Sequence, residues 1–159
     1  MKTEQTLQQV LNKWEFYTLE GDAYYHQQDY KQASKLFTKC VSLLEPWLEK
    51  EHKQAAKVLR LFVLSCHNSA HALSKWGHHK DAEYYYSHAH FRLLSFISHT
   101  KPRALILEMA ITELKGTFAQ LKQYLLDKNK VELAGNIKEE SMRVVRQCYL
   151  QHADQVFTA

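Results

Sequence analysis

The sequence predicts an all-α protein of about six helices, and three observations support this fold class. Apolar residues recur at intervals of three or four through most of the chain, which is the period of an amphipathic helix. No stretch shows the alternation of apolar and polar residues that is typical of a half-buried strand. Only 4 Gly and 2 Pro occur among the 159 residues, which leaves little material for the tight turns that connect strands.

The first two predicted helices cover about 3–27 and 30–44. The apolar stripe of the first helix consists of Leu7, Val10, Leu11, Trp14, Tyr17 and Tyr24. The second helix begins where Asp29 and Gln32 resemble a capping box, in which side chains satisfy backbone N–H groups at a helix start. Pro46 then disfavours helix for the residue before it and suits the first turn of a third helix.

The third predicted helix ends at about Lys75, because Gly77 terminates it. Its segment 58–66 is apolar nearly all round, so we expect this helix to be central and covered on several sides. Asn129 with Glu132 resembles another capping box, which would open the sixth helix. The remaining helices are predicted at about 80–98, 103–126 and 129–156.

Length and charge limit the classes of protein that the chain can belong to. Its 159 residues correspond to one domain, so we predict a single helical domain over 1–159. The net charge is +4, and acidic and basic residues alternate along the chain instead of clustering. A protein that binds nucleic acid is expected to gather Lys and Arg on one surface, so we expect no nucleic-acid partner.

The cysteines and the N-terminus indicate a compartment. Cys40, Cys66 and Cys148 lie far apart in apolar stretches and form no CxxC pair, as expected of thiols in a reducing compartment. The polar N-terminus cannot be a signal peptide, and the most apolar run is too short to span a bilayer. We therefore expect a cytoplasmic protein with no membrane partner.

A pattern of small and aromatic residues occurs twice in the first two thirds of the chain. The first copy consists of Gly21, Tyr24, Ala33, Phe37 and Cys40. The second copy consists of Ala70, Leu73, Trp76, Gly77, Ala82, Tyr86 and Ala89. Small residues at these positions would let two helices approach closely where they cross, while the aromatic rings fill the space beside the crossing.

This spacing resembles the tetratricopeptide repeat. The two copies lie 49 residues apart, from Ala33 to Ala82, against about 34 in the ordinary repeat, so the helices or their connections are longer here. The resemblance covers about 17–94 and implies antiparallel helix pairs wound into a short right-handed α-solenoid. A set of helical hairpins without repeat ancestry is the alternative interpretation.

The resemblance implies a function, because in that family the first helix of each pair lines a concave groove that holds a peptide or a partner helix. By position, the groove residues are Asp22, Tyr25, His26, His67, His71 and Lys75. We therefore expect a non-enzymatic adaptor, scaffold or chaperone-like module that binds a protein partner and needs no cofactor. Because histidine has a reference pKa of about 6.5, binding to an acidic partner should strengthen as the pH falls from about 7.5 to about 6.

The alternative function is that of a metal-binding helical protein. His67 and His71 stand four residues apart on one helical face, a spacing that can hold zinc between two imidazoles. His26 would supply a third ligand from the neighbouring helix of the same groove. Asn68 stands where a zinc protease needs Glu, and no Gly-rich phosphate loop or nucleophile elbow occurs, so we expect no catalytic residues.

The remaining expectations concern the surface and self-association. We expect His78, His79, His88 and His90 to lie at the surface. The last helix carries apolar residues on more than one face, which predicts a homodimer because the ends of a repeat array need polar caps. These residues are Val144, Val145, Cys148, Tyr149, Val156 and Phe157. Alternatively, the last helix folds back onto the fifth and buries them internally.

Overall fold

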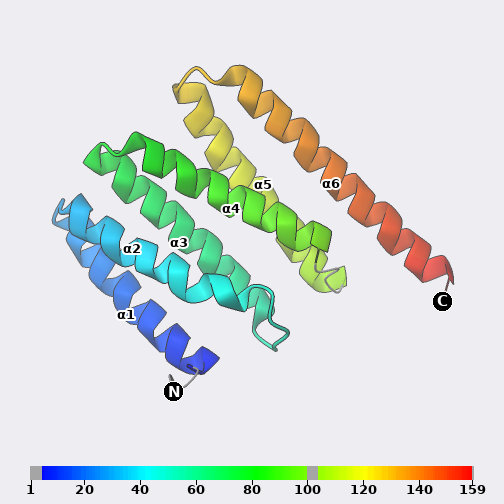
Figure 1. The fold of residues 1–159 in the computed structure, drawn as a ribbon, viewed down its shortest axis with the longest axis horizontal. Helices are drawn as coiled ribbons and strands as arrows, with labels where there is room; N and C mark the ends of the chain where they lie inside the picture. Colours follow the sequence, from blue (N-terminus) through cyan, green and yellow to red (C-terminus); the bar gives the residue numbers. More distant parts are fainter. Residues whose placement is uncertain (1–4, 100–103, 159) are drawn as a thin grey trace. The chain divides into compact units, whose positions relative to one another are not determined.

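The computed structural model describes residues 5–99 and 104–158, with side chains described as far as residue 151. These residues form six α-helices and one short 3-10 turn, and they contain no strand (Figure 1), which confirms the all-α class. The elements are α1 (Leu7–His26), α2 (Tyr30–Leu44), η1 (Glu45–Trp47), α3 (Ala55–Trp76), α4 (His79–His99), α5 (Ala104–Asp127) and α6 (Val131–Thr158).

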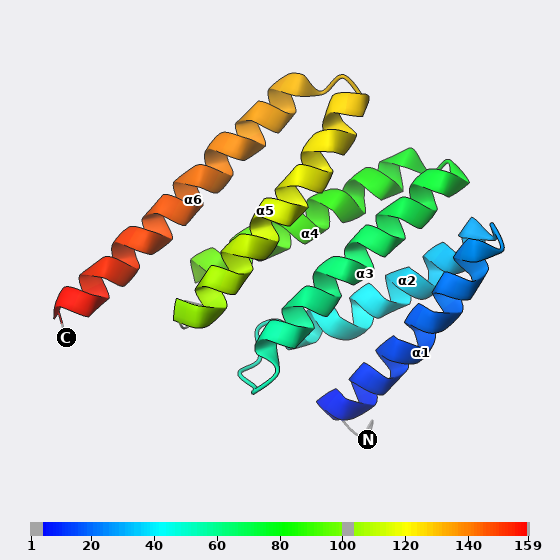
Figure 2. The ribbon, with the colours of Figure 1, turned by 180° about the vertical axis from the view of Figure 1, so that it is seen from behind.

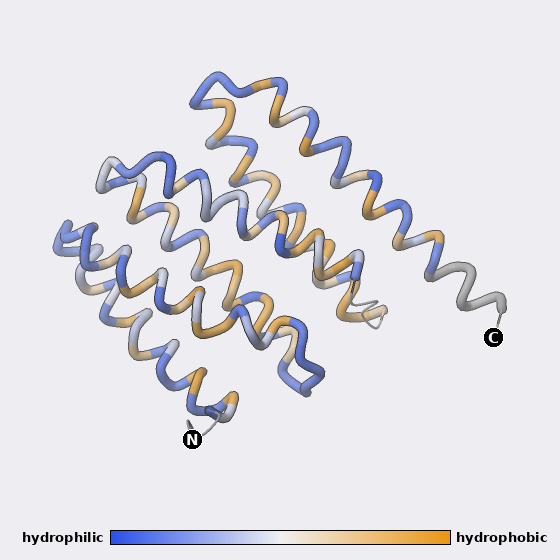
Figure 3. The backbone as a smooth tube through the Cα atoms, in the orientation of Figure 1, coloured by the Kyte–Doolittle hydropathy of each residue, from blue (hydrophilic) through white to orange (hydrophobic). Residues whose placement is uncertain are grey.

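The chain divides into two compact units, Met1–Tyr86 and Ser87–Ala159. Unit 1 contains α1, α2, α3 and the first turns of α4, and unit 2 contains the rest of α4 with α5 and α6. In unit 1, each helix packs mainly on its neighbours in sequence, and α1, α2 and α3 lie side by side in both views of the fold (Figures 1 and 2). Hydrophobic and hydrophilic residues are interspersed along each helix, as expected of amphipathic helices (Figure 3).

Helix α1 begins at a capping box that the sequence analysis did not identify. Thr6 is the N-cap: its hydroxyl accepts a hydrogen bond from the backbone N–H of Gln9 (3.3 Å), and the Gln9 side chain accepts one from the N–H of Thr6 (3.0 Å). Residue 3 lies outside the described residues, but Gln5 and Thr6 are described and precede the helix, so the predicted start was too early. At α2 the predicted bounds are confirmed, and Asp29 caps the helix by accepting from the N–H of Gln32 (3.1 Å).

The prediction that Pro46 opens the third helix was wrong. Pro46 lies in the 3-10 turn η1, and α3 begins only at Ala55. His52 stabilises the intervening loop: its Nδ1 accepts from the N–H of Gln54 (3.2 Å), and its Nε2 lies 3.1 Å from the carbonyl oxygen of Trp47. A side chain that satisfies backbone groups in this way gives the chain an alternative to helix.

The sequence predicted that Gly77 ends the third helix and that Asn129 opens the sixth. The first prediction is confirmed and the second was wrong. Gly77 ends α3 with a φ of 87°, in the left-handed region that favours glycine, as predicted. Asn129 also has a positive φ of 60°, whereas an N-cap residue is usually extended. Its N–H bonds to the carbonyl of Leu126 (3.0 Å), so Asn129 ends α5 and does not cap α6.

The doubled pattern forms part of the core. The buried positions are Gly21, Ala33, Phe37, Cys40, Ala70, Ala82, Tyr86 and Ala89. A Cβ atom at Gly21 would lie 2.6 Å from the ring of Phe37, which demonstrates the close approach of α1 to α2. Leu73 is buried as well, whereas Tyr24 and Trp76 are each 38% exposed and Gly77 is exposed. In place of Tyr24, Tyr25 packs against buried residues of α2 and α3.

Helix α3 is the central helix of unit 1, as predicted. Ser65 accepts a hydrogen bond from the indole N–H of Trp14 on α1 (2.8 Å). The ring of Trp76 lies under the ammonium group of Lys31 on α2 (5.9 Å). On a third side, α3 contacts Tyr86 at the end of the part of α4 that belongs to unit 1. Among the described residues, no helix is both long enough and apolar enough to cross a membrane.

Candidate functional site

The six predicted groove residues all lie in unit 1, on two helices. Asp22, Tyr25 and His26 belong to α1, and His67, His71 and Lys75 belong to α3. Four of them are exposed, whereas Tyr25 and His67 are half-buried. The hydrogen bond from Trp14 to Ser65 joins α1 directly to α3, so the two helices that carry the predicted set are neighbours.

Tyr25 packs into the interior and does not simply line a surface. It contacts the buried cluster of Ala33, Phe37 and Ala72, which joins α2 to α3. Its ring also meets Tyr30 edge to face, with the ring centres 5.2 Å apart. Tyr25 therefore stabilises the three-helix packing, and its loss would disturb the fold as well as the surface.

His67 lies in an apolar environment on α3. Its Nε2 atom is buried and has no hydrogen-bond partner among the described residues. Burial, and to a smaller extent the neighbouring His71, lower the pKa of His67 to about 4, so the ring is neutral at pH 7. The rings of both histidines contact Tyr86, at 6.1 Å for His67 and 5.8 Å for His71.

The predicted metal set is not assembled. His67 and His71 share one face of α3, as their spacing requires. Within the described part of the chain, however, no group of three or more His, Cys, Asp and Glu side chains is arranged to hold a metal ion. His26 therefore does not complete a three-ligand site with them.

A row of five basic residues and one leucine runs along one face of α3. We call it the α3 stripe, and it consists of Lys57, Arg60, Leu64, His67, His71 and Lys75. Successive members are three or four residues apart, which places them on one side of the helix. All are exposed except the half-buried His67, and α3 contains no Asp or Glu over its whole length. The absence of acidic residues from a 22-residue helix is a sequence signal that points to this surface.

The neighbouring helix α1 has a different surface charge. Glu15 and Asp22 are exposed there, so α1 carries carboxylates at its surface, whereas α3 carries none. The cysteines of the protein do not contribute a reactive group, because all three are buried and free. Burial raises the pKa of the thiols of Cys40, Cys66 and Cys148, which keeps them protonated at neutral pH.

Unit 2 contains a polar cluster that the sequence analysis missed. His90 was expected at the surface, yet it is 0% exposed. Its Nε2 lies 2.8 Å from the hydroxyl of Ser141 on α6, and its Nδ1 lies 3.0 Å from the hydroxyl of Thr117 on α5. Burial lowers the pKa of His90 to about 4, so the ring is neutral at pH 7.

The pairing of Ser141 with His90 has the spacing of a nucleophile and its general base. Ser141 is only 8% exposed, however, and His90 is inaccessible to solvent. The second nitrogen faces Thr117, a neutral group that cannot stabilise an imidazolium as a carboxylate does. The cluster therefore joins α4, α5 and α6 inside unit 2 and presents no group to a substrate.

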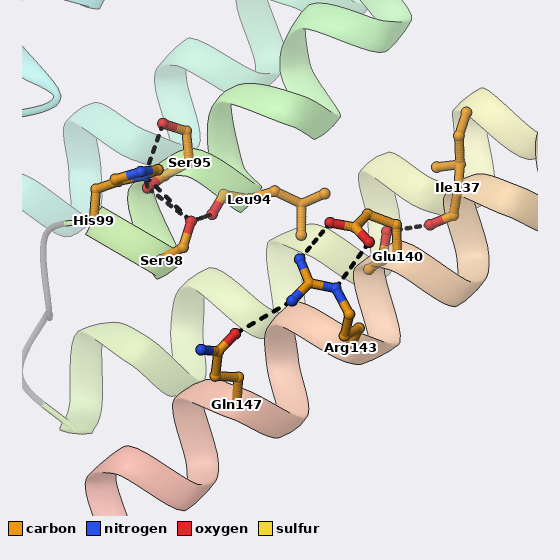
Figure 4. Close-up of polar contacts among 9 residues, drawn as sticks. Leu94, Ser95, Ser98, His99, Ile137, Glu140, Arg143 and Gln147 are labelled. Carbon is orange, nitrogen blue, oxygen red and sulfur yellow. Dashed lines mark hydrogen bonds and ion pairs between the residues drawn. The ribbon is translucent and has the colours of Figure 1, made fainter.

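Several further polar contacts of unit 2 join residues of the same helix (Figure 4). Arg143 donates two hydrogen bonds to Glu140 (2.9 and 2.6 Å) and a third to Gln147 (3.4 Å). The Arg143 side chain is 61% exposed and the Glu140 side chain is 50% exposed, so this is a surface ion pair. These residues form no enclosed site.

The last helix is partly buried and partly exposed. Val144 and Cys148 are buried, and the Cys148 thiol lies 3.4 Å from the carbonyl oxygen of Ile97 within unit 2. Tyr149 is half exposed, whereas the side chains of Val156 and Phe157 lie outside the described residues. Part of the apolar surface of α6 is thus covered internally, as the alternative to dimerisation proposed.

Comparison with known proteins gives a family without a described activity. A family described as "Protein of unknown function (DUF2753)" matches residues 12–155. Searches of the curated proteins and of the solved structures found no match.

Proposed function

The chain belongs to the DUF2753 family, and we propose that it is a non-enzymatic protein-binding module of the tetratricopeptide-like type. In this proposal, antiparallel helix pairs form a right-handed solenoid in the cytoplasm, and the protein acts as an adaptor, scaffold or chaperone-like factor. The observation that carries the proposal is the pairing of a close-packed repeat core with an exposed polar face on α1 and α3.

The core supports the repeat interpretation. Nine of the twelve positions of the doubled pattern are buried, although the two copies are separated by more residues than in ordinary repeats. Gly21 lies so close to the ring of Phe37 that no side chain would fit between them, which is the reason the pattern needs a small residue at this position.

The surface supports partner binding. Asp22, His26, His71 and Lys75 are exposed on adjacent helices, and Leu64 is 44% exposed between the basic residues of α3. An apolar side chain surrounded by charged and polar groups is typical of the centre and rim of a protein interface. The polar cluster around His90 is buried, so it does not favour an enzymatic alternative.

Site-specific photo-crosslinking in the native cell tests this function. A photoreactive amino acid at Leu64 or at Asp22 should crosslink to one or a few specific proteins, because both side chains lie on the proposed surface. The matched control places the same residue at Lys35, an exposed position of α2 outside the set. Identical products from the control position, or none from either groove position, would contradict the proposal. Tyr25 is unsuitable as a probe because it packs into the interior.

A further inference from the structure

We propose that the α3 stripe binds an internal acidic segment of a partner protein, with the partner's carboxylates placed along α3. This inference rests on the proposed function and specifies the chemistry of the same surface. The partner segment contacts the stripe in an extended form, and an apolar residue within it covers Leu64.

The charge of α3 is the first argument. The helix carries Lys57, Arg60 and Lys75 on its exposed face and has no carboxylate of its own to neutralise them. Arg60 and His71 also interact with other residues of the protein, so the argument depends most on the two lysines. Each exposed ion pair contributes only about 0.2–1 kcal/mol, so several carboxylates must act together.

The length of the stripe sets the length of its ligand. With a rise of about 1.5 Å per residue, the stretch from Lys57 to Lys75 spans about 27 Å. An extended segment rises about 3.3 Å per residue, so about eight residues cover this distance. Leu64 lies between the two ends and is 44% exposed, which offers an apolar contact to a residue in the middle of such a segment.

The surroundings of the stripe favour a protein segment over a nucleic acid. A helix is about 10–12 Å in diameter, so a nucleic-acid duplex on α3 would also extend over α1. Glu15 and Asp22 are exposed there and would repel its phosphates. The stripe contains no Phe, Tyr or Trp on which the bases of a single strand could stack, and the rings of both its histidines lie against Tyr86 within the protein.

Fluorescence anisotropy with a synthetic probe tests the proposal. The probe is a labelled peptide of about ten residues, with Glu at most positions, Leu in the middle and both ends blocked, so that no terminal carboxylate is present. We expect it to bind at low salt and to weaken as salt is raised. The Lys57→Glu/Lys75→Glu variant should lose about tenfold or more in affinity.

The controls separate this proposal from its alternatives. The Lys35→Glu/Lys138→Glu variant changes the net charge equally on exposed positions of α2 and α6, and it should retain affinity within about twofold. A peptide with Gln in place of Glu should not bind. Circular dichroism checks each fold, and Lys57→Ala/Lys75→Ala replaces the charge reversal if that variant unfolds.

Three outcomes would overturn the inference. The first is that the stripe variant binds the peptide as tightly as the wild type does. The second is that the Gln peptide binds as well as the Glu peptide. The third is that a labelled single-stranded DNA of the same length binds through the same lysines with equal or higher affinity. The crosslinking experiment at Leu64 does not depend on the charge of the partner. Its success alongside failed peptide binding would reject only the acidic chemistry, whereas its failure would reject the function.

Discussion

The hydroxyl oxygen of Ser141 lies 2.8 Å from Nε2 of His90, in the interior of unit 2. Ser141 also donates to the carbonyl of Ile137 (2.7 Å), and Thr117, on the other side of the ring, donates to the carbonyl of Leu114 (3.0 Å). A hydroxyl has one hydrogen, so while these bonds hold, both oxygens can only accept from His90. A neutral imidazole has one N–H, so one hydroxyl must turn its hydrogen to the ring and release its carbonyl.

Removing one hydroxyl from this cluster should destabilise the protein. Ser141→Ala leaves a nitrogen of His90 without a partner in the interior, which costs about 1–3 kcal/mol. The midpoint of urea unfolding, at constant m-value, measures the loss. Ser42→Ala is the matched control, because Ser42 is exposed on α2 and bonds only to its own helix, so it should change the free energy of unfolding by less than about 0.5 kcal/mol. Equal effects of the two substitutions would contradict a stabilising role for the cluster.

The stability of the protein should fall as the pH drops from about 6.5 to about 4. The unfolded chain binds protons at its histidines near pH 6.5, whereas His67 and His90 in the folded protein do so only near pH 4. Acid therefore favours the unfolded chain, and stability is complete above the upper value. For His90 alone the loss at pH 5 is about 2 kcal/mol.

Chemical denaturation at pH 7 and pH 5 measures this dependence. The His90→Gln variant should show a smaller difference between the two pH values than the wild type, because one of the two buried imidazoles is gone. His88→Gln is the control, since His88 lies beside His90 in sequence but is less buried. A wild-type difference that His90→Gln leaves unchanged would show that His90 does not cause it.

His67, neutral above about pH 4, also cannot contribute to a strengthening of partner binding between pH 7.5 and 6.

Two glycines should respond in opposite ways to the same substitution. Gly21→Ala places a methyl group 2.6 Å from the ring of Phe37, so it should destabilise the protein by about 1–3 kcal/mol. Gly116→Ala adds a Cβ that meets nothing within 4 Å in a helix interior, so it should stabilise by about 0.5–1 kcal/mol. Thermal unfolding of the two variants measures both changes, and a Gly21→Ala variant that unfolds at or above the wild-type temperature would contradict the close packing of α1 on α2.

Sequence patterns predicted the elements better than the details of their packing. The bounds of α2 and the end of α3 followed from Asp29 and Gly77, because caps and positive φ angles are local properties. The late start of α3 could not be predicted, since it depends on hydrogen bonds that His52 makes across its loop. Helix caps and glycines do not reveal side-chain hydrogen bonds such as those of His52.

At the candidate site, too, the sequence predicted the helices that carry the surface but not how their side chains pack. The spacing placed Tyr24 in the core and Tyr25 at the surface, whereas the structure exposes Tyr24 and packs Tyr25 inside. The two side chains point in directions that differ by about 100° around the helix. His90 was expected at the surface because its partners Thr117 and Ser141 lie 27 and 51 residues away, and no spacing rule links them. The acid-free composition of α3 follows only once its start at Ala55 is known, because a helix opened by Pro46 would also contain Glu49 and Glu51.

The protein should form a dimer through the outer face of α1. Leu11 is buried and the indole of Trp14 bonds to Ser65, so these apolar residues of α1 are used internally. Phe16 and Leu19, however, are 55% and 64% exposed, and both lie opposite the face that packs on α2 and α3. Apolar side chains on the outer face of a terminal helix favour pairing with a second copy.

Light scattering at tens of micromolar should therefore give the mass of two chains for the wild type. Leu19→Lys should shift the mass to that of one chain without changing the circular dichroism spectrum, because the side chain takes no part in the core. Leu150→Lys on α6 is the matched control, since Leu150 is 67% exposed and lies in unit 2. A monomer mass for the wild type would refute the dimer, and a monomer produced only by Leu150→Lys would place the interface on α6.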